Sequence, residues 1–410
     1  MLTKISNYNF QAFIQKPKNG NASQSFSEKI AEKVLRFHRQ LPNYEPTRLV
    51  SLKRLARTWG IEDIFVKDES TRFDLKAFKV LGGSYAVAQL ICQKLGIRLA
   101  ETDFPYLTSD EARQRIGRIT LTTATDGNHG RGIAWAAQQL RQDAVIYMPK
   151  GTVPSRVETI RAHGATVEVT DLNYDDAVRL ANGMAEKNGW HMIQDTAWQG
   201  YEEIPLWIMQ GYMTMGKEAV DQMAAQKAAP THVFVQAGVG SMSGAVVGYL
   251  VNRYRERPPA FIIMEPNNAA CIFASAIAGD GRPHAVTGDL TTIMAGLACG
   301  EPNPMGWEIL RDFSTGYVCC DNYVAANGIR ILANPIGEDL SVEAGESGSV
   351  GIGLLDLLLN HRAFEKVKQA LGIGPDSKLL FFNTEGATDP INYREILWYG
   401  KYPALHLPEP

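Results

Sequence analysis

Short apolar runs alternate with longer amphipathic segments along most of this chain. The apolar runs lack a regular polar alternation, which is typical of strands buried on both faces of a parallel sheet. The amphipathic segments predict helices that cover such a sheet, so we expect an α/β fold with mostly parallel sheets. The expected strands are residues 64–67, 119–123, 144–148, 166–170, 191–194, 232–236, 261–264 and 378–382. The expected helices are residues 28–39, 52–59, 131–140, 154–162, 174–187, 205–226, 245–254, 267–278 and 323–332.

With 410 residues, the chain is long enough for two domains. The run of strands and helices around Asp126 predicts a small α/β domain at residues 86–198, inserted into a larger domain made of residues 1–85 and 199–410. Residues 1–27 are polar and weakly patterned, and we expect them to form an arm that leans on the body of the protein.

The composition of the chain argues against several classes of binding partner. The net charge is −3, which provides no broad basic field for nucleic acid or an anionic membrane. No apolar run is long enough to span a bilayer, and residues 1–6 lack the apolar core of a signal peptide. The five cysteines are scattered without a Cys-x-x-Cys pair, and the histidines do not cluster. We therefore expect a cytoplasmic protein without a metal site.

The first chemical signal is Lys79, which follows the expected strand 64–67 and opens a helix with two glycines just after it. Helix N-termini disfavour cations, so an amine at this place loses its proton more readily and can attack a carbonyl carbon. A surface lysine beside a core phenylalanine would give the same short pattern, and this stretch alone does not decide between them.

Three further polar loops each follow an expected strand, where ligands bind in open α/β sheets. Asn128, in the loop 125–130, offers a donor and an acceptor, although this loop is also a good turn former. The glycine-rich loop 238–244 joins a strand to a helix and predicts an anion site, but it lacks the Lys-Ser/Thr ending of a Walker motif. Thr384 places a neutral hydroxyl at a strand end, or caps the following turn.

Together these motifs give the chain a family resemblance. Phe78-Lys79, Gly127-Asn128-His129-Gly130, the glycine loop and Thr384-Glu385-Gly386 follow the order seen in fold-type II pyridoxal phosphate (PLP) enzymes. Within that group the chain is most similar to the diaminopropionate ammonia-lyase family. Further matching segments are residues 66–70, 147–151, 194–198, 294–304 and 345–348. Two departures are Lys76, where we expect asparagine, and Arg48, where we expect proline.

The resemblance implies two three-layer αβα domains with PLP in the cleft between them, a small amino-acid substrate and a homodimer. It implies that Lys79 carries PLP as a Schiff base, with Phe78 and Asn128 beside the ring, and that Thr384 meets the pyridine nitrogen. The residues expected to hold the phosphate are Gly238, Val239, Gly240, Ser241 and Met242.

The implied reaction is α,β-elimination of both enantiomers of 2,3-diaminopropionate, through an aminoacrylate, to pyruvate and two ammonia. Lys79 would serve the L-enantiomer and Asp126 the D-enantiomer, because an unpaired carboxylate facing the cofactor needs a reason to be there. Asp195 is a candidate to pair with the β-ammonium, or is an ordinary turn aspartate. Thr125 and His129 are also expected to contact the substrate.

The alternatives are a serine/threonine dehydratase of the same fold and, more remotely, a catalytically silent PLP- or phosphate-binding protein. A dinucleotide-dependent oxidoreductase is a weaker alternative still. Its glycine turn would follow the first strand of the fold, whereas the glycine turn of this chain comes past the middle.

Overall fold

The computed structural model describes residues 1–405, which divide into two compact units. The first unit contains Met1–Gln24, Pro46–Ala77 and the chain from Met215 onwards, and the second contains Ser25–Glu45 and Phe78–Thr214. The second unit therefore includes residues 86–198 together with flanking segments on both sides. The domain boundaries expected from the sequence stay a prediction.

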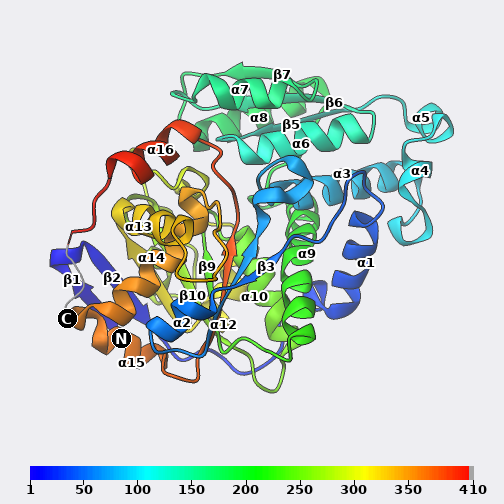
Figure 1. Cartoon of the computed structure of the whole chain (residues 1–410). Coiled ribbons are helices and arrows are strands. Elements are labelled where there is room, and N and C mark those ends of the chain that lie inside the picture. Colours follow the sequence, from blue (N-terminus) through cyan, green and yellow to red (C-terminus); the bar gives the residue numbers. More distant parts are fainter. Residues whose placement is uncertain (406–410) are drawn as a thin grey trace. The chain divides into compact units, whose positions relative to one another are not determined.

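The first unit is built on an eight-stranded sheet (Figure 1). In spatial order the strands are β1 (Leu2–Ile5), β2 (Phe10–Ile14), β11 (Gly316–Cys320), β10 (Ala260–Pro266), β9 (His232–Gln236), β12 (Lys378–Asn383), β4 (Asp63–Asp68) and β3 (Leu49–Ser51). The five strands from β11 to β4 are parallel, and antiparallel pairing is confined to β1, β2 and β3 at the two edges. The expected mostly parallel sheet is confirmed.

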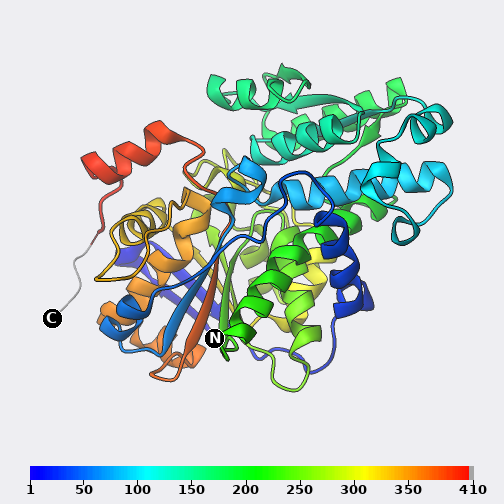
Figure 2. The same ribbon diagram turned by 45° about the vertical axis from the view of Figure 1, so that its right-hand side comes forward.

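Helices cover both faces of this sheet, because successive side chains of a strand point to opposite sides. Val318 packs into the apolar cluster that contains the residues of α14 (Glu346–Asn360). Its neighbour Tyr317 instead donates a 2.6 Å hydrogen bond to the Leu310 carbonyl in α12 (Pro304–Phe313). The other helices of this unit are α2 (Lys53–Thr58), α10 (Ser241–Arg253), α11 (Cys271–Ala278), α13 (Asn322–Ala333), α15 (Glu365–Leu371) and α16 (Pro390–Tyr399). In Figures 1 and 2 the red helix α16 lies at the periphery of this unit, where it packs on α13.

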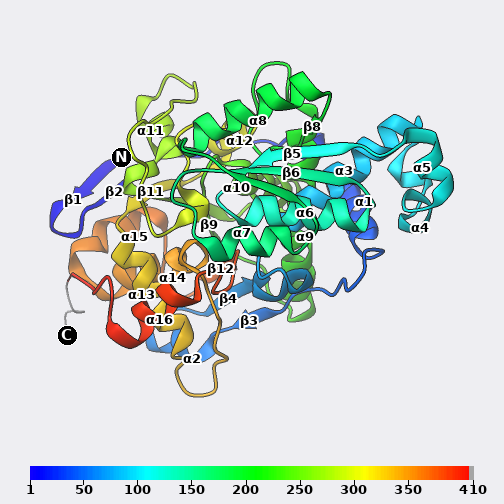
Figure 3. The ribbon, with the colours of Figure 1, turned by 90° about the horizontal axis from the view of Figure 1, so that it is seen from above.

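The second unit has a smaller, wholly parallel sheet in the order β7 (Thr166–Val169), β6 (Asp143–Met148), β5 (Thr120–Ala124), β8 (His191–Met192). Tyr147 packs against α8 (Tyr174–Asn188), whereas Ile146 faces Gly130 in α6 (Asn128–Gln139). Figure 3 shows β5 and β6 between α8 on one side and α6 and α7 (Pro154–Arg161) on the other. This unit also contains α1 (Glu28–His38), α3 (Lys79–Leu95), α4 (Phe104–Leu107) and α5 (Asp110–Ile116), and α9 (Glu203–Ala225) begins in it.

Several local expectations need correction. Residues 1–27 are not a loose polar arm, because β1 and β2 form a hairpin that extends the large sheet and buries Phe10 and Ala12. Helices α6 and α10 begin at Asn128 and Ser241, so residues expected in loops form their first turns. The elements β11, α12 and α16 were not expected at all.

Within residues 1–405, no helix is long and apolar enough to cross a membrane. The same part of the chain contains no group of three or more His, Cys, Asp or Glu side chains that could hold a metal ion.

A buried ionic network ties the end of β4 to α9. Lys67 Nζ and Arg72 Nη2 each donate to Glu218 Oε2 at 2.7 Å, and Arg72 Nε donates to Glu69 Oε2 at 2.8 Å. Thr47 adds a 2.6 Å bond from its hydroxyl to Glu69 Oε1. Burial alone would raise the pKa of the Glu218 carboxyl. The neighbouring charges of Arg72 and Lys67 outweigh burial and lower this pKa to about 2. Two cations and two carboxylates are therefore paired in the interior.

We expect Glu218→Gln to lower the free energy of unfolding by about 3–5 kcal/mol, because it leaves Lys67 and Arg72 buried without their shared carboxylate. The lowered pKa means that Glu218 stabilises the protein fully above pH 4.5 and loses that effect as the pH falls towards 2. The pH dependence of urea unfolding should therefore flatten in that window in the variant. Glu338→Gln, at an exposed ion pair with Arg54, is the matched control and should change neither quantity. Equal stability of E218Q and the parent protein would contradict this account.

Candidate active site

The chemistry of the second unit centres on Lys79, the first residue of α3. Its ammonium forms an ion pair with Asp195 Oδ2, and its side chain is 17% exposed. The same nitrogen lies 5.5 Å from the ring centroid of Phe78 and 5.9 Å from that of Tyr212. A lysine at a helix start that is paired with a buried carboxylate, with aromatic rings nearby and partial access, is suited to nucleophilic chemistry.

Glycines set the position of this lysine. A Cβ on Gly132 of α6 would lie 2.9 Å from the Val80 nitrogen, and one on Gly82 would lie 2.5 Å from Tyr212 Cε1. A Cβ on Gly211 of α9 would lie 2.4 Å from the carbonyl oxygen of Leu81. These separations are shorter than real Cβ contacts. The first turn of α3 can therefore touch the backbones of α6 and α9 only because these positions lack side chains.

Asp195 is ionised despite its burial. Its side chain is 3% exposed, and this burial alone would raise its pKa. The charge of Lys79, together with a 3.3 Å hydrogen bond from the Tyr212 hydroxyl, lowers the pKa to about 2. The carboxylate is therefore an acceptor and not a proton donor at neutral pH.

His129 offers a second acceptor in the same unit. Its Nε2 lies 2.8 Å from the carbonyl oxygen of Ile193, so Nε2 carries the proton and Nδ1 has the lone pair. Within residues 1–405, Nδ1 is buried and has no hydrogen-bond partner. Burial lowers the pKa of the ring, which keeps it neutral.

The loop before α6 is shaped by Thr125. Its buried hydroxyl oxygen accepts hydrogen bonds from the backbone nitrogens of Gly127 and Gly130, each at 2.9 Å. Asp126 lies on this loop, half-buried, and its carbonyl accepts from Arg156 at 3.3 Å. Asn128, also half-buried, begins α6. Thr125 thus fixes the loop that presents the Asp126 and Asn128 side chains.

In the first unit, the loop after β9 fits a phosphate. Gly238, Val239 and Gly240 have backbone N–H groups for which the described residues supply no acceptor. The next residues, Ser241 and Met242, form the first turn of α10, where further N–H groups point out of the helix. A Cβ on Gly238 would lie 3.1 Å from the Gly296 oxygen, so a larger residue at position 238 would crowd this loop. Donors without acceptors at a helix start suit an anion.

The Thr384 hydroxyl is suited to donate a hydrogen bond to a ring nitrogen. It follows β12 and is 3% exposed. Gln236, at the end of the adjacent strand β9, donates from Nε2 to Thr384 Oγ1 at 2.8 Å. Because the threonine oxygen accepts this bond, its own proton is available to donate to a neutral nitrogen.

The structure brings Lys79, Asp195 and His129 into one electrostatic group in the second unit. The roles predicted for these and the other site residues stay predictions. Two residues that contact the candidate site residues were not predicted from the sequence. Tyr212 bonds Asp195, but in the sequence it is an ordinary aromatic residue within a helix. Gln236 bonds Thr384, and its position as a polar residue at the end of an apolar strand could have indicated it. Of the two departures, Arg48 donates to Asp68 at 2.8 Å, and the half-exposed Lys76 pairs with Glu343 at 3.2 Å.

Comparisons with known proteins point to the same chemistry. The family model described as "Pyridoxal-phosphate dependent enzyme" matches residues 41–370. The chain is 50% identical over 385 residues to diaminopropionate ammonia-lyase of Escherichia coli K12, covering 94% of this chain and 95% of that protein. It is 47% identical over 400 residues to the enzyme of that name from Salmonella typhimurium, covering 97% and 99%.

A crystal structure of the Escherichia coli enzyme, in complex with an aminoacrylate-PLP azomethine reaction intermediate, superposes with a TM-score of 0.90. The two chains are 47% identical in that superposition, which covers 97% of this chain and 99% of the other. The chain therefore belongs to the pyridoxal-phosphate dependent enzyme family and, within it, to the diaminopropionate ammonia-lyases.

Proposed function

We propose that this chain catalyses the PLP-dependent α,β-elimination of D- and L-2,3-diaminopropionate to pyruvate and two ammonia. The observation that carries the proposal is the ion pair between Lys79 and the buried Asp195. It sets a reactive amine beside a carboxylate that suits an ammonium group. The similarity to diaminopropionate ammonia-lyases over nearly the whole chain supports the substrate.

PLP, when bound, supplies the electron sink for this chemistry. Lys79 would hold it through its amine, with Phe78 and Asn128 beside the ring. The N–H groups of the loop from Gly238 to Met242 would bind its phosphate, and the hydroxyl of Thr384 would donate to the ring nitrogen. The N–H groups of Gly238, Val239 and Gly240, which have no acceptor within the described residues, and the spare Thr384 proton support this assignment.

Two residues take the α-proton in this proposal. The Lys79 amine would serve as the base for one enantiomer, and the Asp126 carboxylate would serve for the other. Asp126 lies half-buried on a loop that Thr125 fixes through two hydrogen bonds. A base held in this way keeps its position during proton transfer.

Asp195 and His129 select the leaving group. The β-ammonium has three N–H donors and departs as neutral ammonia, so it needs acceptors and no incoming proton. Asp195 stays ionised because its pKa is about 2, and His129 Nδ1 is an unpaired acceptor within the described chain. A hydroxyl leaving group needs a proton donor in that place, which disfavours a serine/threonine dehydratase.

We also propose a homodimer in the cytoplasm. The similarity over nearly the whole chain to characterised relatives supports a shared assembly, and the five unpaired cysteines suit a reducing compartment.

Purified, PLP-loaded protein should release pyruvate from both D- and L-2,3-diaminopropionate much faster than from L-serine or L-threonine. The measurement is pyruvate formation under identical conditions for all four compounds. Turnover of the hydroxy amino acids alone would replace the proposal with a dehydratase. Absence of aldimine absorbance from the purified protein would favour a catalytically silent PLP- or phosphate-binding protein.

Asp126→Asn should remove turnover of the D-enantiomer selectively. Loss of a general base costs about 10²–10⁴-fold, so we expect a fall of that size for D-diaminopropionate and only a few-fold change for the L-enantiomer. Initial rates on the separate enantiomers measure this. Lys79→Ala, the comparison variant, should abolish both activities, and an equal loss of both rates in D126N would refute the two-base assignment.

Asp195→Asn should lower kcat/KM for diaminopropionate by about 10–100-fold relative to its effect on serine, because a charge-assisted hydrogen bond to the β-ammonium is lost. Tyr212→Phe keeps the carboxylate and removes only one of its hydrogen bonds, so it should change this ratio less. Asp176→Asn, at an exposed pair with Arg179, is the matched control. An unchanged diaminopropionate-to-serine preference in D195N would end the assignment.

A further inference from the structure

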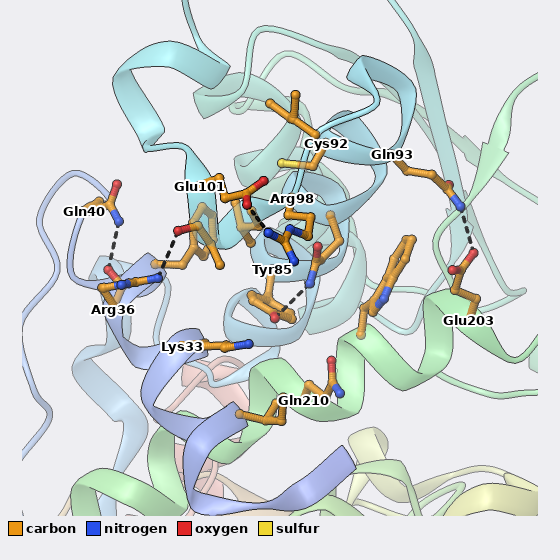
Figure 4. Close-up of a pocket in the computed structure, with 17 residues that line it drawn as sticks. Lys33, Arg36, Gln40, Tyr85, Cys92, Gln93, Arg98, Glu101, Glu203 and Gln210 are labelled. Carbon is orange, nitrogen blue, oxygen red and sulfur yellow. Dashed lines mark hydrogen bonds and ion pairs between the residues drawn. The ribbon is translucent and has the colours of Figure 1, made fainter. Parts of the chain in front are cut away.

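A second concave site lies wholly within the second unit, and it shares no residue with the candidate active site. Helices α1, α3 and α9 and the segment 97–101 surround a cavity of about 590 Å³ (Figure 4). Small-molecule sites usually enclose about 300–1,000 Å³, so the cavity has the size of a ligand site. We call it the α1–α3–α9 cavity.

The inner wall of the cavity is apolar. Phe37 and Cys92 are almost fully buried there, and Trp207 is half-buried. Burial raises the pKa of the Cys92 thiol to about 12, so this side chain is neutral. Aromatic and thiol surfaces of this kind favour a flat apolar body.

The rim carries an excess of positive charge. Lys33, Arg36 and Arg98 line the cavity together with two carboxylates, Glu101 and Glu203. Arg98 is already paired with Glu101, and Gln93 donates to Glu203 at 3.0 Å. Arg36 donates to a carbonyl at 3.3 Å. Of the three cations, Lys33 has no hydrogen-bond or ion-pair partner anywhere in residues 1–405, and Figure 4 draws its ammonium towards the cavity.

One polar group on the inner wall is also incompletely used. The Tyr85 hydroxyl accepts a 2.9 Å hydrogen bond from Gln89, and its own proton has no acceptor within the described chain. Tyr85 is 5% exposed, and burial raises its pKa to about 12, so the proton remains available to donate. The cavity thus offers an unpaired cation at the rim and a spare donor inside.

We propose that the α1–α3–α9 cavity binds a small organic carboxylate with a flat apolar body and a hydrogen-bond acceptor at its far end. The carboxylate pairs with Lys33, the body lies against Phe37 and Trp207, and the acceptor receives the proton of Tyr85. Each part of this ligand meets one feature of the cavity: the exposed ammonium of Lys33 at the rim, the aromatic wall, and the spare donor of Tyr85.

Occupancy of this cavity is transmitted to Lys79, and this part of the proposal rests on the proposed function. The helices that surround the cavity also hold the candidate site, since α3 begins at Lys79 and α9 carries Tyr212. Buried His38 of α1 joins them, with ring nitrogens 2.7 Å from Thr214 Oγ1 in α9 and 2.9 Å from the Leu81 carbonyl in α3. A ligand that spans the three helices therefore acts on the first turns of α3.

The test uses PLP-loaded protein and 4-acetylbenzoate, which has a carboxylate, an aromatic ring and a carbonyl acceptor at opposite ends. Isothermal titration should show saturable binding, weakened about tenfold in Lys33→Gln and again in Tyr85→Phe, because each removes one hydrogen-bonding group. Lys29→Gln, an exposed lysine on the same helix outside the cavity, should bind as the parent protein does. Acetophenone, which lacks the carboxylate, should bind weakly to all variants.

Two outcomes would overturn the binding site: no saturable binding at millimolar 4-acetylbenzoate, or equal binding by parent, K33Q and Y85F. Loss of a dimer in K33Q, without binding of the carboxylate, would instead assign the cavity to a contact between two copies. Coupling is measured as the change in kcat/KM at saturating 4-acetylbenzoate, and an unchanged value would refute the transmission to Lys79. Because titration does not depend on turnover, failure of the binding site and failure of the proposed reaction are distinguishable.

Discussion

The arrangement of the reactive groups depends on how closely α3 approaches two other helices. Its first turn touches backbone at Gly132 of α6 and at Gly211 of α9, where any side chain would overlap with it. Such contacts leave no room for sliding, since packed backbones have few alternative arrangements. This close packing fixes the positions of the candidate site residues. Helix α3 begins with Lys79, α6 begins just after Asp126, and α9 carries Tyr212, which bonds Asp195.

The protein buries two lysine–carboxylate pairs, and their surroundings differ. Lys67 is inaccessible and donates to Thr47, Glu218 and Gln222, so all of its protons are used. Lys79 is partly accessible and forms an ion pair with Asp195. A fully buried ammonium whose protons are all used holds a structure together, whereas a partly accessible one can exchange a partner for another reactant. Burial of a lysine alone would not distinguish these two roles.

The sequence predicted the features that rest on local rules. Fully apolar runs marked the parallel strands, and Lys79 was expected to open a helix after a strand, as it does in the structure. Prediction from the sequence failed where tertiary contacts decide which structure a segment adopts. The hairpin of Leu2–Ile5 and Phe10–Ile14 is short and partly polar, and it is stabilised by pairing with a strand some three hundred residues later. Tyr212 belongs to an apolar helix face, and only the fold turns its hydroxyl towards Asp195.

The tautomer of His129 fits the proposed preference for an amine as leaving group. The Ile193 carbonyl fixes the proton on Nε2, so Nδ1 is an acceptor, and burial opposes its protonation. Asp195 is held ionised by Lys79 and accepts as well. Two acceptors stabilise a group rich in N–H donors and cannot supply the proton that a departing hydroxide requires. In the proposed reaction, discrimination between an ammonium and a hydroxyl would therefore rest on these two acceptors, neither of which can donate the proton that the wrong leaving group needs.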